Sequence, residues 1–401
     1  MAVSPPAEPV TLSAPPPAPT GRAWFLDWLR ILALGALVLY HVGMLYVRWD
    51  FHVKSPHAGA ALEPWMRLTE PWRMSLLFLV SGAATALMWR GLATGALLRR
   101  RARQLLLPLL CGMLLVVPPQ AYFEVLAKHG YTGSYAEFMA LYLRGYGGFC
   151  QTGKCLILPT WNHLWFLPYL WLYTALLAAA VALWPGTLAL LARGAARLFA
   201  TRAALLLLPM ALLALLRWGL YARYPQTYAL WGDGYAHPLF GGMFLLGVAL
   251  AGAPVLWPRL AALRWAGLLL ALLAWALLVF GPALGLRPGA WRPVCVAVQQ
   301  WGAIVAAVGF AYHHLNHDHP LRAWLTRAVF PVYLLHQTVL IALSQWLRPA
   351  ALPPLAEGLL IVALTLGLCL LAYRLLLPWP RLHVWFGLGA GAAATTRATA
   401  Q

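Results

Sequence analysis

The chain has 401 residues, of which 62% are hydrophobic and 10% are charged, and its 29 Lys and Arg against 10 Asp and Glu give a formal net charge of +19. This composition excludes a water-soluble globular protein and indicates a polytopic membrane protein. Because most basic residues fall in short segments between apolar runs, the charge is interpreted as an orientation signal, and nucleic-acid binding is not expected.

Residues 1–22 contain Pro-Pro and Ala-Pro-Pro-Pro runs and few charges, so they are predicted to form a disordered tail. They lack the basic start and apolar centre of a cleaved signal peptide. The first apolar run is also too long for such a peptide, and it is interpreted as a retained helix.

Ten apolar runs are long enough to span a bilayer. They cover residues 24–47, 72–90, 104–122, 161–184, 203–221, 236–252, 262–280, 294–313, 327–347 and 356–377. The predicted fold is therefore an all-α, polytopic membrane helical bundle of about ten transmembrane helices, within a single domain over residues 23–380. Five arginines between Arg90 and Arg103 form one short basic turn, which predicts a cytoplasmic location for that turn and for both termini, including the C-terminal tail 381–401.

The first apolar run carries Asp27, Arg30 and His41. Eleven residues at about 100° each return the chain to within roughly 20° of the starting face, about 16 Å further along the helix. Arg30 and His41 are therefore expected to share one face, with Asp27 close to it. Ionisable groups inside a membrane are costly and are functional candidates by default. Arg30 and His41 are expected to line one cavity that joins two aqueous compartments.

The chemistry of these three groups suggests roles for each of them. Arg30 at the inner end can hold an anionic donor, and a neutral His41 can accept a proton from a hydroxyl. The alternatives are an interfacial arginine and a hydrogen-bonded interior histidine. Asp27 either orients or neutralises Arg30, or it is a carboxylate at the positive end of the helix dipole.

The longest outer loop, about residues 123–160, contains Cys150 and Cys155 with four residues between them. On an oxidising face these two can form a small-loop disulfide, and two free thiols are the alternative. The remaining cysteines, Cys111, Cys295 and Cys369, lie in apolar runs and are expected to be inert core residues.

Further candidates lie in other spans. Ser81 offers either a hydroxyl to a cavity or a small residue for close helix packing. His163 and Trp165 begin span four, where they can contact a sugar or belong to an aromatic belt. Tyr333 and His336 lie in span nine, and His336 is either a second site residue or a helix–helix hydrogen-bond partner.

The run His313-His-Leu-Asn-His-Asp-His is the one stretch that suggests a metal site. Its spacing matches no recognised site, so a polar interfacial loop is predicted and no metal is expected. The sequence contains no phosphate-binding Gly loop, no Gly-x-Ser-x-Gly motif and no His-Glu-x-x-His motif.

Five stretches in order resemble the acyltransferase family 3 membrane proteins, and more specifically the branch that contains the glucans biosynthesis protein C type. The similarity covers roughly residues 24 to 380. The stretches are Phe25-Leu-Asp-Trp-Leu-Arg with the Arg30–His41 spacing, Pro71-Trp-Arg-Met-Ser-Leu-Leu-Phe-Leu-Val-Ser-Gly, Arg99-Arg-Arg-Ala-Arg-Gln-Leu-Leu-Leu-Pro, Trp161-Asn-His-Leu-Trp-Phe-Leu and Phe330-Pro-Val-Tyr-Leu-Leu-His-Gln.

The resemblance implies acyl transfer from a cytoplasmic acyl-CoA to a hydroxyl of a carbohydrate acceptor, with His41 as the catalytic base and Arg30 in donor binding. The family's Arg-x-x-Arg pair is matched by Arg100 and Arg103. Together with Arg99 and Arg101 these cations suit the phosphates of coenzyme A, although they also serve as a topology signal. Some branches carry a Glu in span four where this chain has Leu167-Pro-Tyr-Leu-Trp-Leu-Tyr, so a mechanism that requires that carboxylate is in doubt.

The sequence thus predicts an O-acyltransferase of the bacterial inner membrane that moves a succinyl or acetyl group from acyl-CoA to a periplasmic or cell-envelope glycan. Its expected partners are the lipid bilayer, acyl-CoA and the carbohydrate acceptor. One alternative is an ion- or proton-coupled transporter in which Arg30, His41 and His336 form the pathway. Another is a scaffold that presents the acyl group to a separate enzyme. A covalent acyl-histidine relay is a further mechanistic alternative to general-base catalysis.

Overall fold

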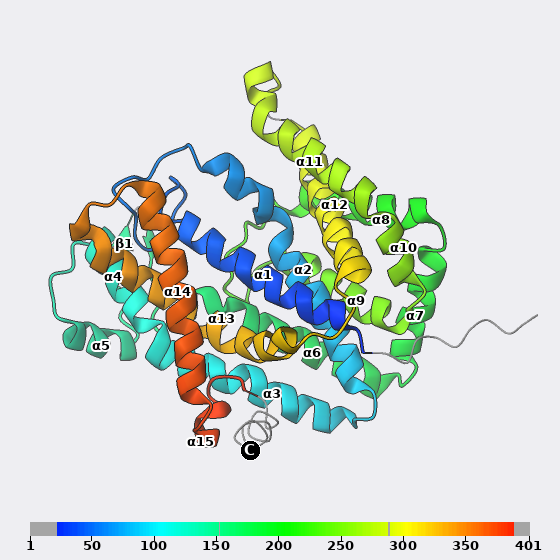
Figure 1. Cartoon of the computed structure of the whole chain (residues 1–401), viewed down its shortest axis with the longest axis horizontal. Helices are drawn as coiled ribbons and strands as arrows, with labels where there is room; N and C mark the ends of the chain where they lie inside the picture. Colours follow the sequence, from blue (N-terminus) through cyan, green and yellow to red (C-terminus); the bar gives the residue numbers. More distant parts are fainter. Residues whose placement is uncertain (1–21, 152, 288, 389–401) are drawn as a thin grey trace, which may run out of the picture.

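The computed structural model describes residues 22–151, 153–287 and 289–388, so nearly all of the predicted N-terminal tail and the C-terminal stretch 389–401 lie outside the described residues. The described chain consists almost entirely of helices (Figure 1). The α-helices are α1 Trp24–Gly43, α2 Glu63–Trp89, α3 Thr94–Cys111, α4 Pro118–Lys128, α5 Tyr135–Leu143, α6 Phe166–Leu183, α7 Thr187–Leu198, α8 Arg202–Leu220, α9 Ala236–Gly252, α10 Leu256–Ala262, α11 Arg264–Phe280, α12 Trp291–His314, α13 Pro320–Leu347, α14 Pro354–Leu376 and α15 Pro380–His383.

Shorter elements join these helices. A π-helix, Gly112–Val116, follows α3, and three 3₁₀ turns cover Asn162–Trp165, Gly281–Leu284 and Arg348–Ala350. Two short antiparallel strands, β1 Cys150–Gln151 and β2 Lys154–Cys155, form a hairpin. Cys150 and Cys155 are joined by a disulfide, which decides between the two alternatives left open by the sequence.

Eight helices are long and apolar enough to cross a membrane, and two bent pairs raise the number to ten among the described residues. The bent pairs are α3 with its π-helix followed by α4, at 43°, and α9 followed by α10, at 111°. The predicted all-α polytopic bundle of about ten spans is confirmed. The short, Gly-rich run at 236–252 is helix α9, which ends in the sharper of the two bends.

The basic segment after Arg90 differs from the sequence prediction. The turn is confined to residues 90–93, where Gly91 adopts a left-handed φ of +81°, and Arg99, Arg100, Arg101 and Arg103 lie within α3. The physical reason is that residues 96–107 contain only Ala, Leu, Arg and Gln, which are strong helix formers. The arginines therefore project from successive faces of a helix, and only some of them can reach one site.

Helix α1 occupies the centre of the bundle, with α2, α12, α13 and α14 packed around it (Figure 1). Helices α2 and α9 approach each other closely. A Cβ added to Gly82 would meet the backbone carbonyl of Phe244, and one added to Gly247 would meet that of Leu79. Small residues at this interface let the two backbones touch, as is common between membrane helices. The central position of α1 exposes its two ends to separate cavities.

Candidate active site

Two cavities approach the middle of α1 from its opposite ends. The first, called here the Arg30 cavity, has a volume of about 590 Å³ and is lined by Arg30 near the start of α1. The second, called here the His41 cavity, has a volume of about 240 Å³ and is lined by His41 near the end of α1. Leu37 and Tyr333 line both cavities, so the two spaces adjoin at these side chains. Arg30 and His41 therefore line two adjoining cavities instead of the single cavity that the sequence predicts.

The hydrogen bonds around His41 fix the position of its proton. Nδ1 of His336 lies 2.7 Å from the carbonyl oxygen of Tyr333, which can only accept, so this nitrogen is the donor. In the neutral ring, Nε2 of His336 is then an acceptor, and it lies 2.8 Å from Nδ1 of His41. His41 must donate from Nδ1, and its Nε2 carries the lone pair. A neutral imidazole in this tautomer can accept a proton from a hydroxyl group.

The surroundings of His41 hold this geometry. His336 is fully buried within α13, and its ring lies nearly coplanar with that of His41, at an interplanar angle of 18°. The ring of His163 meets the His336 ring edge-on, with 5.2 Å between the centroids. His336 therefore acts on His41 through a direct hydrogen bond.

The Arg30 cavity is rich in guanidinium groups. Besides Arg30 it is lined by Arg100, Arg101 and Ser81. Arg101 is only 4% exposed; it donates a hydrogen bond to Oγ1 of Thr85 at 2.8 Å, and its Nε has no hydrogen-bond partner among the described residues. Buried cations without a carboxylate partner suit an anionic ligand such as a phosphate.

The other two arginines of the basic segment on α3, Arg99 and Arg103, line neither cavity. Of the Arg-x-x-Arg pair implied by the family resemblance, only Arg100 reaches the Arg30 cavity, where it lies beside Arg101. Arg327 of α13 lines this cavity as well, and the sequence analysis did not identify it.

Asp27 lines neither cavity and lies in an ion-pair cluster, one member of which, Arg22, lines the Arg30 cavity. Its Oδ2 accepts hydrogen bonds from Arg322 at 2.7 Å and from Arg22 at 3.1 Å. Arg322 also binds Asp318 at 2.6 Å, and this hydrogen bonding holds the pKa of the Asp318 carboxyl below its ordinary value. The cluster ties the start of α1 to the start of α13. Asp27 therefore makes its ion pairs with Arg322 and Arg22, and it lies in the first turn of α1, where the second alternative from the sequence places a carboxylate.

His163 and Trp165 both line the His41 cavity. Trp165 packs its ring against Tyr228 with centroids 4.4 Å apart, forming part of an aromatic wall. His163 is 7% exposed; its Nε2 donates to the carbonyl oxygen of Leu334 at 3.1 Å, and its Nδ1 accepts from Gln120 at 3.3 Å.

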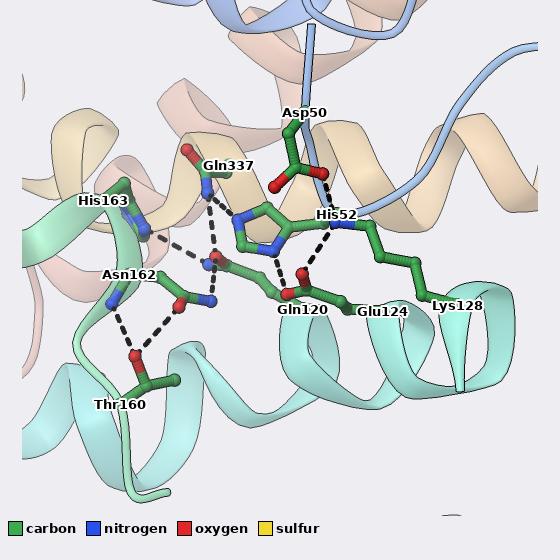
Figure 2. Close-up of polar contacts among 9 residues, drawn as sticks. All are labelled: Asp50, His52, Gln120, Glu124, Lys128, Thr160, Asn162, His163 and Gln337. Carbon is green, nitrogen blue, oxygen red and sulfur yellow. Dashed lines mark hydrogen bonds and ion pairs between the residues drawn. The ribbon is translucent and has the colours of Figure 1, made fainter. Parts of the chain in front are cut away.

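Figure 2 shows a polar network that the sequence analysis did not identify. His52 donates from Nδ1 to Glu124 at 2.6 Å, and Glu124 also binds Lys128 at 3.0 Å. The amide nitrogen of Gln337 is 2.9 Å from Nε2 of His52 and 3.1 Å from Oε1 of Gln120. The network thus continues from the exposed Asp50, which binds Lys128, to His163 beside the His41 cavity (Figure 2). The spacing of residues 120, 124 and 128, which places them on one helix face, is the sequence signal that could have revealed it.

The His41 cavity also contains polar residues that were not predicted. Arg73 of α2 lies over the ring of Tyr40, with its guanidinium carbon 3.6 Å from the ring centre. Glu70, Arg217 and Gln300 line the same cavity. Arg73 falls inside the second predicted span, so an intramembrane charge was the available signal.

The described residues contain no group of three or more His, Cys, Asp or Glu that could hold a metal ion. In the histidine-rich run, His313 and His314 belong to the last turn of α12, and His319 accepts a hydrogen bond from Leu321 at the start of α13. The hydrogen bonds of His41 allow acid–base chemistry at its Nε2, between a cationic cavity and an aromatic one.

A comparison with protein families matches residues 24–374 to a model described as an acyltransferase domain. Comparison with curated proteins and with solved structures gave no match. The matched residues include every helix from α1 to nearly the end of α14, and with them all of the side chains described for the two cavities except those after residue 374.

Proposed function

Since the chain belongs to the acyltransferase 3 family, we propose that it is a membrane-embedded O-acyltransferase that moves an acyl group from a cytoplasmic acyl-CoA to a hydroxyl of a cell-envelope glycan. The observation that carries the proposal is the meeting of two cavities at Leu37 and Tyr333, one helical turn from His41. Two substrates that enter from opposite ends can meet there.

The Arg30 cavity suits the donor. Its guanidinium groups can hold the phosphates of coenzyme A by charge-assisted hydrogen bonds, with the exposed Arg100 at the entrance and the buried Arg101 and half-buried Arg30 further inside. The apolar side chains Leu34 and Leu77 line the same cavity and can contact the pantetheine arm. This orientation assigns the start of α1 to the cytoplasmic side of a bacterial inner membrane, in line with the basic residues near Arg90.

The His41 cavity suits the acceptor. Tyr40, Trp165 and Tyr228 line it with aromatic rings, and Gln226 and Gln300 add amide groups. Rings that present a flat apolar face beside polar groups are suited to sugars, which have both apolar faces and hydroxyl edges. A glucan-like acceptor with a succinyl or acetyl donor is the version of the proposal that the branch resemblance favours.

The reaction follows from the tautomer of His41. Nε2 takes the proton of the acceptor hydroxyl as the oxygen attacks the thioester carbon near Leu37 and Tyr333. The tetrahedral intermediate then expels the sulfur, the carbon–sulfur bond breaks, and the thiolate takes the proton back from the imidazolium. The ester and free coenzyme A leave toward opposite ends of α1. His336 accepts the hydrogen bond from Nδ1–H of His41 throughout and so stabilises the transient imidazolium.

The test is acceptor-dependent release of coenzyme A by the purified protein in nanodiscs, together with mass spectrometry of the ester. We expect His41→Ala to abolish both signals while the variant remains folded. His317→Ala is the matched control, because His317 is exposed in the loop between α12 and α13. Thiol release by His41→Ala at the wild-type rate would refute the proposal. Gradient-driven substrate uptake without thiol release would favour the transporter instead.

A further inference from the structure

Three arginines of the described residues are buried to more than nine-tenths: Arg73, Arg101 and Arg322. Arg322 forms ion pairs with two carboxylates, Asp27 and Asp318. Arg73 and Arg101 have no ion pair with a carboxylate, and each lines one of the two cavities. A buried charge without a counter-ion is costly unless a ligand supplies one. Arg101 is already assigned to the donor phosphates, which leaves Arg73 to be explained.

The hydrogen bonding of Arg73 is incomplete. The side chain is 5% exposed, and its Nε has no hydrogen-bond partner among the described residues. Its hydrogen bond to Oγ1 of Thr69 is long, at 3.4 Å. The guanidinium stacks on the ring of Tyr40, and Tyr40 is also a side-chain hydrogen-bond partner of Arg73. A guanidinium has five N–H donors in a planar fork, and the unpartnered Nε–H is available to an oxyanion.

The charge balance of the His41 cavity also favours an anion. Arg73 and Arg217 both line it, and Glu70 is the carboxylate among its lining residues. Arg217 is itself held over the ring of Tyr221, with 4.1 Å between the guanidinium carbon and the ring centre, and it donates to the hydroxyl of Tyr235 at 3.3 Å. With neutral histidines the cavity therefore carries one excess positive charge. Glu70 is an exposed residue at the rim, whereas Arg73 is buried.

Arg73 lies close to the proposed catalytic base, His41. Its guanidinium lies against Tyr40, the residue that precedes His41 on α1. A group bound by Arg73 is therefore close to the imidazole without being attached to the reacting oxygen.

We propose that Arg73 binds an anionic group of the substrate, a carboxylate or a phosphate, in the His41 cavity during acyl transfer. This deepens the proposed acyltransferase function and rests on it. The anionic group can come from two sources: a sugar unit of the acceptor, or the far end of a dicarboxylic acyl chain that passes Leu37. In either case Arg73 selects substrates by charge, and a neutral analogue of the same size leaves a buried guanidinium unpaired.

The experiment compares matched pairs of substrates. Succinyl-CoA is paired with butyryl-CoA, and an acceptor glycan with an anionic substituent is paired with the same glycan lacking it. Thiol release is measured for the wild type, Arg73→Gln, Arg73→Lys and the control Arg67→Gln, which changes an arginine of the same helix that lines neither cavity. We expect the wild type to prefer the anionic member of one pair by about 10- to 100-fold in kcat/KM, as a hydrogen-bonded charge would provide.

The pair that shows the preference identifies the source of the anion. Arg73→Gln should lose the preference, because the anionic member loses its cationic partner and the neutral member no longer leaves a buried guanidinium unpaired. Arg73→Lys should recover part of it, and Arg67→Gln should retain it. A wild type that treats both members of both pairs alike would overturn the proposal, and so would an Arg73→Gln variant that slows all substrates equally.

A binding measurement separates this proposal from the proposed function. Free succinate and glucose 6-phosphate should raise the thermal unfolding temperature of the wild type in detergent, and succinamide and glucose should not. Arg73→Gln should lose the response. A wild type that releases no thiol but shows this response would refute the acyltransferase and keep the anion site. A wild type that releases thiol and shows neither the response nor a charge preference would refute the anion site and keep the acyltransferase. If Arg73→Gln does not fold, the wild-type comparisons with the matched substrates and ligands decide whether the cavity binds an anion.

Discussion

We expect His336 to control the reactivity of His41 although it lines neither cavity. Replacing His336 with Leu removes the acceptor that lies 2.8 Å from Nδ1 of His41, and it keeps a buried side chain of comparable size. The tautomer of His41 with its proton on Nε2 is then no longer disfavoured, and that tautomer cannot take a proton from a hydroxyl group.

The magnitude follows from the hydrogen bond. In the wild type the unproductive tautomer leaves Nδ1 of His41 and Nε2 of His336 facing each other without a proton between them. Losing this tautomer preference lowers the productive fraction of His41 by only about twofold, whereas losing the hydrogen bond to the charged imidazolium costs about 1.5–3 kcal/mol, which corresponds to a roughly 10- to 150-fold lower rate. His336→Leu should lower kcat by this factor, and the KM for the donor should stay unchanged because the Arg30 cavity is untouched.

The assay is steady-state thiol release with varied donor and acceptor, combined with thermal unfolding to establish that the variant is folded. His336→Gln is the informative second variant, since its Oε1 can accept a hydrogen bond near the position of Nε2 and should restore much of the rate. A folded His336→Leu variant with wild-type kcat would refute the reasoning. So would a His336→Gln variant that is no faster than His336→Leu.

Three further outcomes are expected. Arg30→Ala should raise the KM of the donor more than that of the acceptor, because Arg30 lines only the donor cavity; steady-state kinetics with the opposite pattern would contradict this assignment. Arg322→Leu should lower the free energy of unfolding by about 3–5 kcal/mol, because Asp27 loses its buried partner. In the same denaturation experiment, adding Asp27→Asn should recover part of the loss. Unchanged stability of Arg322→Leu would count against the ion pair. Gly82→Ala and Gly247→Ala should each destabilise the protein by about 1–3 kcal/mol, because the added Cβ meets a backbone carbonyl across the α2–α9 interface. An unaltered melting temperature of either variant would contradict that close approach.

The number of spans and the all-α class could be predicted from the sequence because hydropathy reports on long apolar helices directly. The bends in the helix pairs could not be predicted from the sequence. The chain turns by 111° between α9 and α10 at Ala253, Pro254 and Val255, and a run of apolar residues carries little information on the direction in which it continues. The basic segment differs from its prediction for a related reason: a cluster of charges predicts a turn, whereas helix propensity extends α3 back to Thr94.

Within the candidate site, helical periodicity predicts one face and one cavity for Arg30 and His41, and it could not show that Leu37 and Tyr333 lie between two cavities. Asp27 illustrates the limit of the argument. Its partner Arg322 is 295 residues away in the sequence, so no spacing rule connects them. The role of His336 is similar, because a histidine in a span gives no indication of which nitrogen will meet a second histidine on another helix.

Arg73 was missed for a different reason. It was part of a motif that supported the family resemblance, and its own chemistry was not considered. A single arginine inside a membrane span is a sufficient signal by itself to warrant a functional hypothesis. The network around His52 and Gln120 could not have been predicted in full, because it joins α4, α13 and two loops through side-chain amides (Figure 2).

The most direct test of the two-cavity account is the rate of acyl transfer by Leu37→Trp. Leu37 is 4% exposed and lines both cavities, so a larger side chain there fills the place where donor and acceptor meet. We expect this variant to remain thermally stabilised by coenzyme A and to lose acceptor-dependent thiol release, whereas Leu37→Ala keeps both. Transfer by a folded Leu37→Trp variant at the wild-type rate would contradict the account.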